Sequence, residues 1–334
     1  MERPRGPEVT VGRGPMPSLR FRRNGTFTIV QLTDVHWSNG EGADHRTRAL
    51  IHEVLKAERA DLVALTGDIV SGAAAHDPCR AWDEVARIIE AHEIPWAAVF
   101  GNHDDEGATS RAQMLRAQRR HPLCLSERGP KGLTGVGNYV LRVRSARSRR
   151  LAAALYFLDS GSYDDLGIGH YDWIAHDQIA WYRRVSALLG QEFGRRGEKL
   201  PALAFFHIPL PEWDEVWQTQ VCRGEKHEAV CGPALNSGFF AALVEAGDVM
   251  GVFCGHDHVN DYEGELHGVR LGYGRATGFA EYGREGFPRG ARVIRLREGR
   301  RRFDTWMRLE GGQRWDPPVH QPEARKPLEP PSEG

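Results

Sequence analysis

The sequence contains no long hydrophobic run and no excess of charge of either sign. A helix needs about 20 consecutive apolar residues to cross a bilayer, and no segment of the chain comes near that length. The formal net charge is −1, which gives no long-range attraction to nucleic acid or to an anionic membrane. We therefore expect no membrane partner. Nucleic acid is disfavoured as a partner, although a local basic patch would be compatible with this charge.

Cysteine is scarce, with five residues in the whole chain. The number is odd and no Cys-x-x-Cys pair occurs, which is typical of a reduced cytosolic protein rather than a disulfide scaffold. Cys222 and Cys231 lie in one polar stretch and could pair, but two free thiols are the favoured interpretation. The N-terminal residues 1–23 lack the apolar segment of a signal peptide. We expect a cytoplasmic location.

The chain is otherwise typical of a globular protein, with 334 residues, 40% of them hydrophobic and 27% charged. Its two ends differ in composition from the rest. Residues 1–24 carry Pro, Gly and Arg, and residues 311–334 contain six prolines and little that could pack. We predict a flexible arm at 1–24, one domain at 25–310 and a disordered tail at 311–334.

Between these ends, apolar strands alternate with amphipathic helices. The first half is predicted to contain strands at 27–32, 62–65 and 96–100 and helices at 45–59 and 82–92. This β-α-β-α-β order predicts an α/β sheet with parallel strands. Residues 139–144 and 151–158 are expected to form a hairpin, and its five arginines are interpreted as solvated rather than as a phosphate-binding patch. Further helices are predicted at 175–193 and 237–246, and strands at 202–206, 249–254, 269–271, 291–296 and 303–308.

Five polar blocks each follow directly after a predicted strand. Ligands bind beyond the carboxyl ends of strands in open α/β sheets, so blocks more than 200 residues apart in the sequence can converge on one site. Each block alone is a weak signal, but the ordered combination favours a functional site. The blocks are Asp34-Val35-His36, Gly67-Asp68, Gly101-Asn102-His103-Asp104, His207 and Gly255-His256-Asp257-His258.

The residue types in these blocks suit a pair of metal ions. They offer carboxylate and carboxamide oxygens and imidazole nitrogens but no thiolate, a set that suits Mn, Fe, Zn, Co or Ni. Asp34 and His36 are two residues apart, as are His256 and His258, and in extended backbone this spacing directs both side chains to one side. A single carboxylate such as Asp68 can bridge two cations, with one oxygen for each.

The blocks, in this order, resemble the calcineurin-like metallophosphoesterase superfamily over about residues 27–309. Within it, the chain is similar to a bacterial relative of the purple-acid-phosphatase-like proteins of plants and fungi. The segments that carry this closer likeness are Phe205-Phe206-His207-Ile208-Pro209-Leu210-Pro211-Glu212, Asn236-Ser237-Gly238-Phe239-Phe240 and Gly255-His256-Asp257-His258-Val259-Asn260-Asp261.

The resemblance implies a fold and a role for each block. The fold would be a four-layer α/β sandwich of two packed mixed β-sheets flanked by helices, with a dimetal site at the carboxyl ends of the strands. His103 would face the leaving group, with Asp104 behind it. The first metal would be held by Asp34, His36, Asp68 and His258, and the second by Asp68, Asn102, His207 and His256.

Two positions depart from the purple acid phosphatases. Those enzymes carry a tyrosine three residues after the bridging aspartate, where this chain has Ser71. They also usually lack a histidine at the position of His36. The site is therefore expected to be of the non-purple type, similar to Mn/Fe phosphodiesterases, and an acidic pH optimum is disfavoured.

The resulting hypothesis is a dimetal-dependent phosphoester hydrolase, a phosphatase or phosphodiesterase that uses two divalent or trivalent ions of Mn, Fe or Zn. The ions would share a water and supply a bridging hydroxide for in-line attack on phosphorus. His103 would protonate the departing oxygen as general acid, and Asp104 would hold its tautomer. The expected substrate is a phosphorylated small molecule or a phosphoprotein.

Two alternatives remain at this stage. A nuclease of the same superfamily is disfavoured by the neutral charge and by the lack of an evident DNA-capping domain. A non-catalytic scaffold, which some relatives have become after losing ligands, is disfavoured because every expected ligand is present.

Substrate contacts are harder to assign from the sequence. Trp37 and Asn39 follow the first metal block, and Tyr163 follows a predicted strand, so these three residues are candidates for substrate binding. For each of them a structural or surface role is slightly favoured over substrate contact. The same holds for His45, Asp164, Tyr171 and Asn236. Residues 212–233 are predicted to be a long loop that could act as a lid. Substrate identity and oligomeric state stay open.

Overall fold

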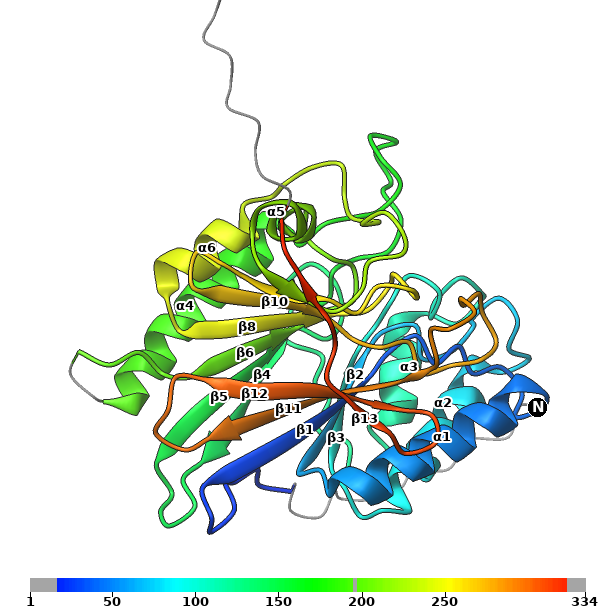
Figure 1. Ribbon diagram of the computed structural model, residues 1–334, viewed down its shortest axis with the longest axis horizontal. Helices are drawn as coiled ribbons and strands as arrows, with labels where there is room; N and C mark the ends of the chain where they lie inside the picture. Colours follow the sequence, from blue (N-terminus) through cyan, green and yellow to red (C-terminus); the bar gives the residue numbers. More distant parts are fainter. Residues whose placement is uncertain (1–16, 195–196, 323–334) are drawn as a thin grey trace, which may run out of the picture.

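The computed structural model describes residues 17–194 and 197–322, which fold around two mixed β-sheets packed face to face (Figure 1). Helices cover the outer face of each sheet, so the layers follow the order helix, sheet, sheet, helix. This confirms the four-layer α/β architecture.

The first sheet has the strand order β13-β12-β11-β1-β2-β3. Strands β1, β2 and β3 run parallel, whereas β11 runs antiparallel to both β1 and β12. The strands are β1 (Thr26–Leu32), β2 (Leu62–Thr66), β3 (Trp96–Val99), β11 (Gly290–Arg297), β12 (Phe303–Leu309) and β13 (Arg314–Trp315). The helices on its outer face are α1 (Ala43–Glu58), α2 (Pro78–Glu90) and α3 (Arg111–Gln118).

The second sheet has the strand order β14-β7-β9-β10-β8-β6-β5-β4. Its centre is parallel, from β5 through β6 and β8 to β10, and the predicted hairpin forms the antiparallel pair β4–β5. The strands are β4 (Tyr139–Arg144), β5 (Leu151–Phe157), β6 (Ala202–Phe205), β7 (Cys222–Arg223), β8 (Val249–Cys254), β9 (Glu263–Leu266), β10 (Val269–Tyr273) and β14 (Val319–His320). Helices α4 (His176–Phe193), α5 (Glu212–Thr219) and α6 (Phe239–Ala246) pack with it.

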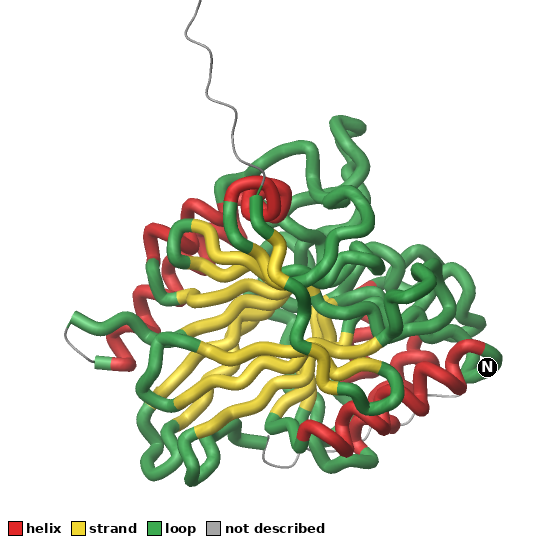
Figure 2. Tube along the Cα trace, viewed as in Figure 1, coloured by secondary structure: helices red, strands yellow, loops and turns green. Residues whose placement is uncertain are grey.

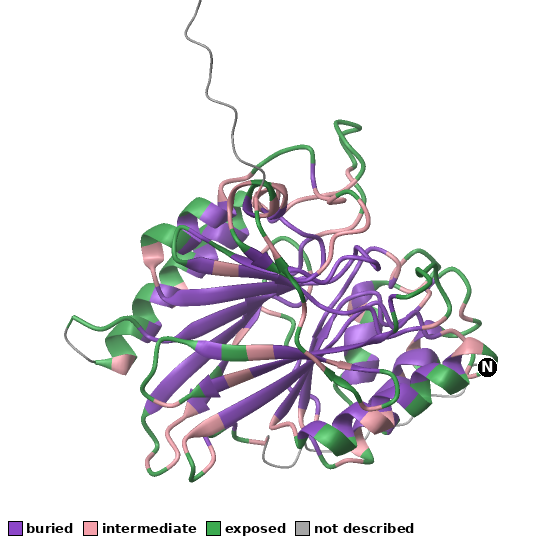
Figure 3. Cartoon of the chain, in the orientation of Figure 1, coloured by how far each residue is buried: buried purple, intermediate pink, exposed green. Residues whose placement is uncertain are grey.

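Alternation along β1 shows how the layers are filled. Phe27 and Ile29 point into the apolar cluster between the sheets, while Val30 and Leu32 point to the cluster under the helices. Successive side chains of a strand face opposite sides, so a strand buried on both faces carries apolar residues on both. Figure 3 shows the central strands of both sheets as buried along most of their length.

The loops gather beyond one end of the strands, on the right of the view in Figure 2. This is the carboxyl end of β1, whose N-terminus lies at the lower left in Figure 1. Gln31 ties the two sheets together there, because its Nε2 donates to Thr66 Oγ1 on β2 and to the Cys254 carbonyl on β8. The predicted polar blocks therefore follow strand ends that are held side by side.

Both ends of the described chain pack where the sequence predicts flexibility. In the predicted arm, Leu19 and Phe21 are buried between the sheets, and the backbone of Arg20 pairs with that of Arg144 in an isolated β-bridge. In the predicted tail, β13 pairs with β12 and β14 pairs with β7. Buried apolar side chains hold the N-terminal segment, and pairing with strands β12 and β7 holds the C-terminal one. The rest of both predicted segments, 1–16 and 323–334, lies outside the described residues.

Residues 212–233 are also more ordered than the predicted loop. They begin with α5, where Trp213 and Val216 are three residues apart and both buried, and continue into β7. This spacing places two apolar side chains on one helical face, although the segment is too short to show a clear period. The helix predicted to start at 82 begins earlier: α2 starts at Pro78, after an Asp77 cap whose side chain accepts from Arg80 N.

The packing of residues 17–24 predicts a measurable cost when Phe21 is shortened. Phe21 is buried and contacts the Phe27 ring edge-on, with centroids 5.9 Å apart. We expect Phe21→Ala to lower the free energy of unfolding by about 3 kcal/mol, measured by urea denaturation. Leu188→Ala, at an exposed position of α4, should change it by less than about 0.5 kcal/mol. Equal small effects would mean that the arm is not packed.

Candidate metal centre

The side chains predicted as metal ligands come together at the strand ends. Three of the five blocks follow β1, β2 and β3 of the first sheet, and two follow β6 and β8 of the second. The site therefore lies at the junction of the two sheets. All seven predicted ligands are buried: Asp34, His36, Asp68, Asn102, His207, His256 and His258.

Within the described residues, potential ligand atoms form two groups. The first consists of Asp34, His36 and His258, and the second of Asp68, His207 and His256. The potential ligand atoms of each group lie within 4.8 Å of one another. This grouping matches the division into two metal positions that the resemblance implies.

The first group brings the Nε2 atoms of two imidazoles close together. Nε2 of His36 lies 3.1 Å from Nε2 of His258, which in turn lies 3.6 Å from Asp34 Oδ1. His258 is oriented by its other ring nitrogen, Nδ1, which lies 3.3 Å from the Tyr282 carbonyl. A carbonyl only accepts, so Nδ1 carries the hydrogen and Nε2 is left with a lone pair for a cation.

The second group is organised around His207. Its Nδ1 lies 2.8 Å from the Thr66 carbonyl, which directs the Nε2 lone pair toward the site by the same argument. Nε2 lies 3.0 Å from Asp68 Oδ2 and 3.2 Å from Asn102 Oδ1. It is also 3.2 Å from Nδ1 of His256. Asn102 thus joins this group, as predicted.

Asp68 lies between the groups. Its Oδ1 accepts from the His103 backbone N–H at 2.8 Å. Its Oδ2 is buried, and the groups that face it are Nε2 of His207 at 3.0 Å and Nε2 of His36 at 3.9 Å. A buried carboxylate oxygen needs positive charge beside it. A cation would satisfy it, so this atom fits a metal pair.

The backbone of the ligands is strained. Among the described residues, seven non-glycine residues have positive φ, and four of them are predicted ligands: Asp34, His36, Asp68 and His256. This conformation is uncommon for residues with a Cβ, and such strain concentrates at functional sites. Backbone hydrogen bonds hold it, for example from Asp34 N to the Gly67 carbonyl and from His36 N to the Asp68 carbonyl.

Burial sets the charge states of the site. It lowers the pKa of His36 to about 4 and that of His256 to about 3, and it raises the pKa of Asp34 to about 6. Neutral imidazoles are the form that binds metal. Burial works against a charged His207 too, but Asp68 outweighs it and raises the pKa of His207 to about 9. Without a cation, His207 therefore provides the positive charge beside Asp68.

His103 lies at the rim of the site, as expected for a group that does not bind metal. Its side chain is partly exposed, and its ring lies edge-on to His36 with centroids 5.3 Å apart. Burial lowers the pKa of His103, but Asp68 and Glu106 outweigh this and raise it. The charged, proton-donating form is thereby favoured.

The predicted role of Asp104 is wrong. Its buried carboxylate does not stand behind the His103 ring but accepts four backbone N–H groups, from Asp68, Ile69, Val70 and Gly101. It shapes the turn that carries Asp68, and those donors use its lone pairs. The carboxylate beside His103 is that of Glu106, with Oε2 2.8 Å from His103 Nδ1.

The candidates for substrate binding fare differently. Trp37 is completely buried in the cluster under the helices, and its indole N–H donates to Glu84. Asn39 ties two loops together through His76 N and the Ala74 carbonyl. Both are structural, because the chain turns away from the site after His36. Tyr163 does reach it, since its hydroxyl accepts from Asn102 Nδ2 at 3.0 Å.

Other aromatic rings border the ligands. Tyr171 contacts His256 edge-on, with centroids 4.3 Å apart, and Tyr282 stacks on His258 at 4.3 Å. Sequence reasoning missed Tyr282 and Glu106. Glu106 stands three residues after His103, a spacing that could have indicated it, whereas no local pattern marks Tyr282. His45 and Asn236 are exposed, and Asp164 accepts N–H groups within its own loop.

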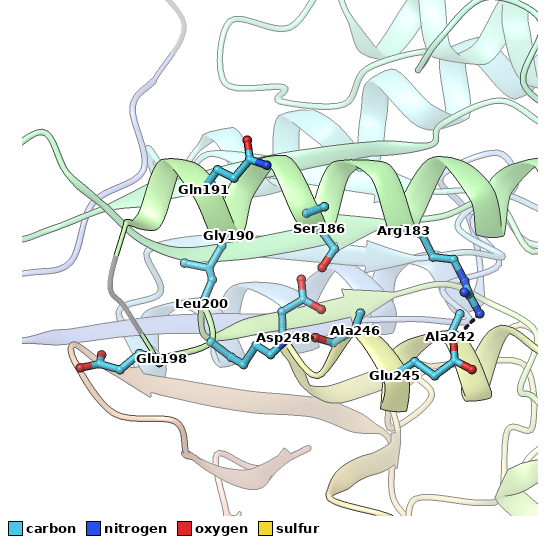
Figure 4. A pocket seen from close by; sticks show the side chains of 13 residues that line it. Arg183, Ser186, Gly190, Gln191, Glu198, Leu200, Ala242, Glu245, Ala246 and Asp248 are labelled. Carbon is cyan, nitrogen blue, oxygen red and sulfur yellow. Dashed lines mark hydrogen bonds and ion pairs between the residues drawn. The ribbon is translucent and has the colours of Figure 1, made fainter.

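A separate hollow of about 620 Å³ opens between α4 and α6 (Figure 4). An Arg183–Glu245 ion pair crosses it, and the Asp248 carboxylate accepts from the hydroxyls of Tyr156 and Tyr182. Asp248 precedes β8, whereas His256 follows it. The hollow is thus at the opposite end of the strand, roughly 20 Å from the ligands, and is no part of the metal centre.

Fold and site together define an α/β protein with two groups of potential metal ligands where the strand ends of its two sheets meet. The chain belongs to the calcineurin-like phosphoesterase family, whose model matches residues 27–260. No described helix is long and apolar enough to cross a membrane.

Individual proteins agree with this assignment. The chain is 35% identical to "Probable inactive purple acid phosphatase 29" of Arabidopsis thaliana, covering 89% of this chain and 83% of the relative. It is 32% identical to "Phosphatase DCR2" of Saccharomyces cerevisiae, covering 88% of this chain and 55% of the relative. A solved dimetal phosphatase from Danio rerio has the same fold, with a TM-score of 0.54 and 16% identity over 84% of this chain and 98% of that one.

Contacts at Gly101 predict that any side chain there would disturb the centre. A Cβ at Gly101 would lie 2.1 Å from Asp68 Oδ1 and 2.5 Å from Asp68 N, so the carboxylate would have to move. We expect Gly101→Ala to weaken Mn²⁺ binding at least about 10-fold, measured by titration calorimetry. Gly190→Ala is the matched control, because a Cβ there meets open space. Unchanged affinity in Gly101→Ala would contradict this geometry.

Proposed function

We propose that the protein is a phosphoester hydrolase that works with two cations. The observation that carries this proposal is the buried Asp68 carboxylate, whose Oδ2 faces imidazole nitrogens of both buried ligand groups, His36 and His207. Asp34, His36 and His258 would hold one cation, and Asn102, His207 and His256 the other, with Asp68 shared. A cation pair would supply positive charge to a phosphoester and lower the pKa of water.

The position of His103 supports the role of general acid. His103 is at the rim, accessible to solvent, and beside the His36 ring of the first group. A general acid must be within reach of the departing oxygen. With the phosphoryl group bound over the ligands, a side chain at the rim could reach that oxygen. The Glu106 carboxylate, 2.8 Å from Nδ1 of His103, favours the proton-bearing form.

The proposal also covers the identity of the metal ions and the class of substrate. The nitrogen and oxygen ligands suit Mn, Fe or Zn, and Ser71, with its hydroxyl 3.5 Å from His36 Nδ1, provides no tyrosinate for a purple iron centre. We propose a phosphorylated small molecule or a phosphoprotein as substrate, and a cytoplasmic location.

A nuclease is less well supported. The hairpin arginines Arg142 and Arg144 pair with Glu192, and the turn between β4 and β5 lies at the end of β5 opposite to its carboxyl end. These cations are therefore not next to the metal ligands and would not guide a nucleic-acid backbone into the site.

A non-catalytic role is the second candidate, because the Arabidopsis relative is named as probably inactive. Against it, this chain retains a complete set of seven buried ligands in the arrangement described above. A scaffold would have no use for the costly buried oxygen of Asp68 or for four strained ligand residues.

Hydrolysis of two chromogenic esters separates these candidates. Protein loaded with Mn²⁺, Fe²⁺ or Zn²⁺ is expected to hydrolyse p-nitrophenyl phosphate, bis-p-nitrophenyl phosphate or both. Turnover of the diester alone would favour a phosphodiesterase or nuclease. Bound metal without turnover of either ester, or neither metal nor turnover, would favour the scaffold and overturn the proposed hydrolase.

His103 provides the test of the acid role. We expect His103→Asn to keep both cations, measured by elemental analysis, and to lower kcat about 100-fold or more for an alkyl phosphate. The loss should be much smaller for p-nitrophenyl phosphate, whose leaving group needs no proton. The control is His92→Asn, on the turn after α2. If His103→Asn loses metal, or slows both esters equally, His103 is not the acid.

A further inference from the structure

A chain of three hydrogen bonds, the His103–Asn102 relay, connects His103 at the rim to Asn102, a predicted ligand of the second cation. Oε2 of Glu106 lies 2.8 Å from His103 Nδ1, and Oε1 accepts from the Tyr163 hydroxyl at 2.5 Å. The Tyr163 oxygen accepts in turn from Asn102 Nδ2 at 3.0 Å. Glu106 and Tyr163 stand between two residues that the proposed reaction uses, but neither belongs to a predicted block.

The donors and acceptors in this chain allow one arrangement. A carboxylate only accepts, so His103 Nδ1 must carry a hydrogen, and Nε2 is the nitrogen left for a substrate. The Tyr163 hydroxyl gives its single hydrogen to Glu106, so it can only accept from Asn102. Asn102 must then direct its NH₂ to Tyr163 and its Oδ1 to the site, where Oδ1 lies 3.2 Å from His207 Nε2.

We propose that Glu106 and Tyr163 are positioning residues: Glu106 holds His103 with Nε2 toward the leaving group, and Tyr163 holds the Asn102 oxygen toward the second cation. This inference rests on the proposed hydrolase function. It assigns two roles outside the ligand set, and it replaces the role first given to Asp104.

The surroundings of the relay support positioning rather than a chance surface contact. Two neighbouring carboxylates are occupied elsewhere, because Asp104 accepts backbone N–H groups and Asp105 pairs with Arg111. Tyr163 is half-exposed, but its loop is fastened at the base by a bridge to Tyr171. Tyr171 in turn rests against His256, so the loop that carries Tyr163 is tied to the metal centre at two points.

The two halves of the relay predict different defects. Glu106→Gln keeps the shape of the side chain but replaces an obligatory acceptor by an amide, so it should loosen His103. We expect kcat for an alkyl phosphate to fall about 10- to 100-fold, with little change in KM or in p-nitrophenyl phosphate turnover. Tyr163→Phe removes the acceptor of the Asn102 NH₂, and should weaken one of two Mn²⁺ affinities about 10-fold.

A measurement that needs neither metal nor turnover tests whether Glu106 holds the His103 ring. In metal-free protein with ¹⁵N-labelled histidine, NMR at a pH where the imidazole is neutral reports which nitrogen carries the hydrogen. The His103 signals are those that disappear in His103→Asn. We expect the Nδ1–H form in the unmodified protein and a mixture in Glu106→Gln. Glu192→Gln, whose carboxylate pairs with Arg142 and Arg144, is the matched control and should change neither tautomer nor kinetics.

The outcomes separate this inference from the proposed function. If no ester is hydrolysed but Glu106→Gln shifts the tautomer, the hydrolase function is wrong, whereas the positioning of His103 by Glu106 is supported. If the esters are hydrolysed but Glu106→Gln leaves both tautomer and leaving-group dependence unchanged, the relay is overturned. In Glu106→Gln/His103→Asn, the loss of kcat should equal that of His103→Asn alone, because Glu106 acts through His103; additive losses would contradict that route.

Discussion

The buried carboxylate of Asp68 is the constraint on which the rest of the site depends. It is withdrawn from water, held through Oδ1 by the His103 backbone, and left with Oδ2 facing histidines from both sheets. Such an oxygen is stable only beside positive charge. In the protein without metal His207 supplies that charge, and a cation pair would supply more. Burial keeps His36 and His256 neutral, so their nitrogens are available as ligands.

The two-sheet fold makes this arrangement possible. Each sheet contributes only part of the ligand set, so the site exists only where the strand ends of both sheets meet. Gln31 fastens that junction by donating to Thr66 and to the Cys254 carbonyl. Close approach leaves no room for side chains at some positions: a Cβ at Gly255 would lie 1.9 Å from Thr33 Oγ1. The glycines of the blocks are thus a packing requirement.

The sequence was sufficient to predict the parts of this site that lie at strand ends. Asp34, Asp68 and His256 follow apolar runs that a sheet must align, so their convergence followed from periodicity and strand order. Contacts made across the fold could not be read in this way. Tyr163 reaches Glu106 over 57 residues, and Trp37 is buried in the cluster under the helices, where its indole donates to Glu84 of α2. The packing of Phe21 and of β14 was missed because two or three apolar residues give no period.

The most direct test is the location of the cations. Crystals grown with Mn²⁺ and measured near the manganese absorption edge would give anomalous peaks at the metal positions. We predict two peaks per chain, one among Asp34, His36 and His258 and the other among Asn102, His207 and His256, with the Asp68 carboxylate in contact with both. A single peak, peaks remote from Asp68, or no peak at saturating Mn²⁺ would contradict it.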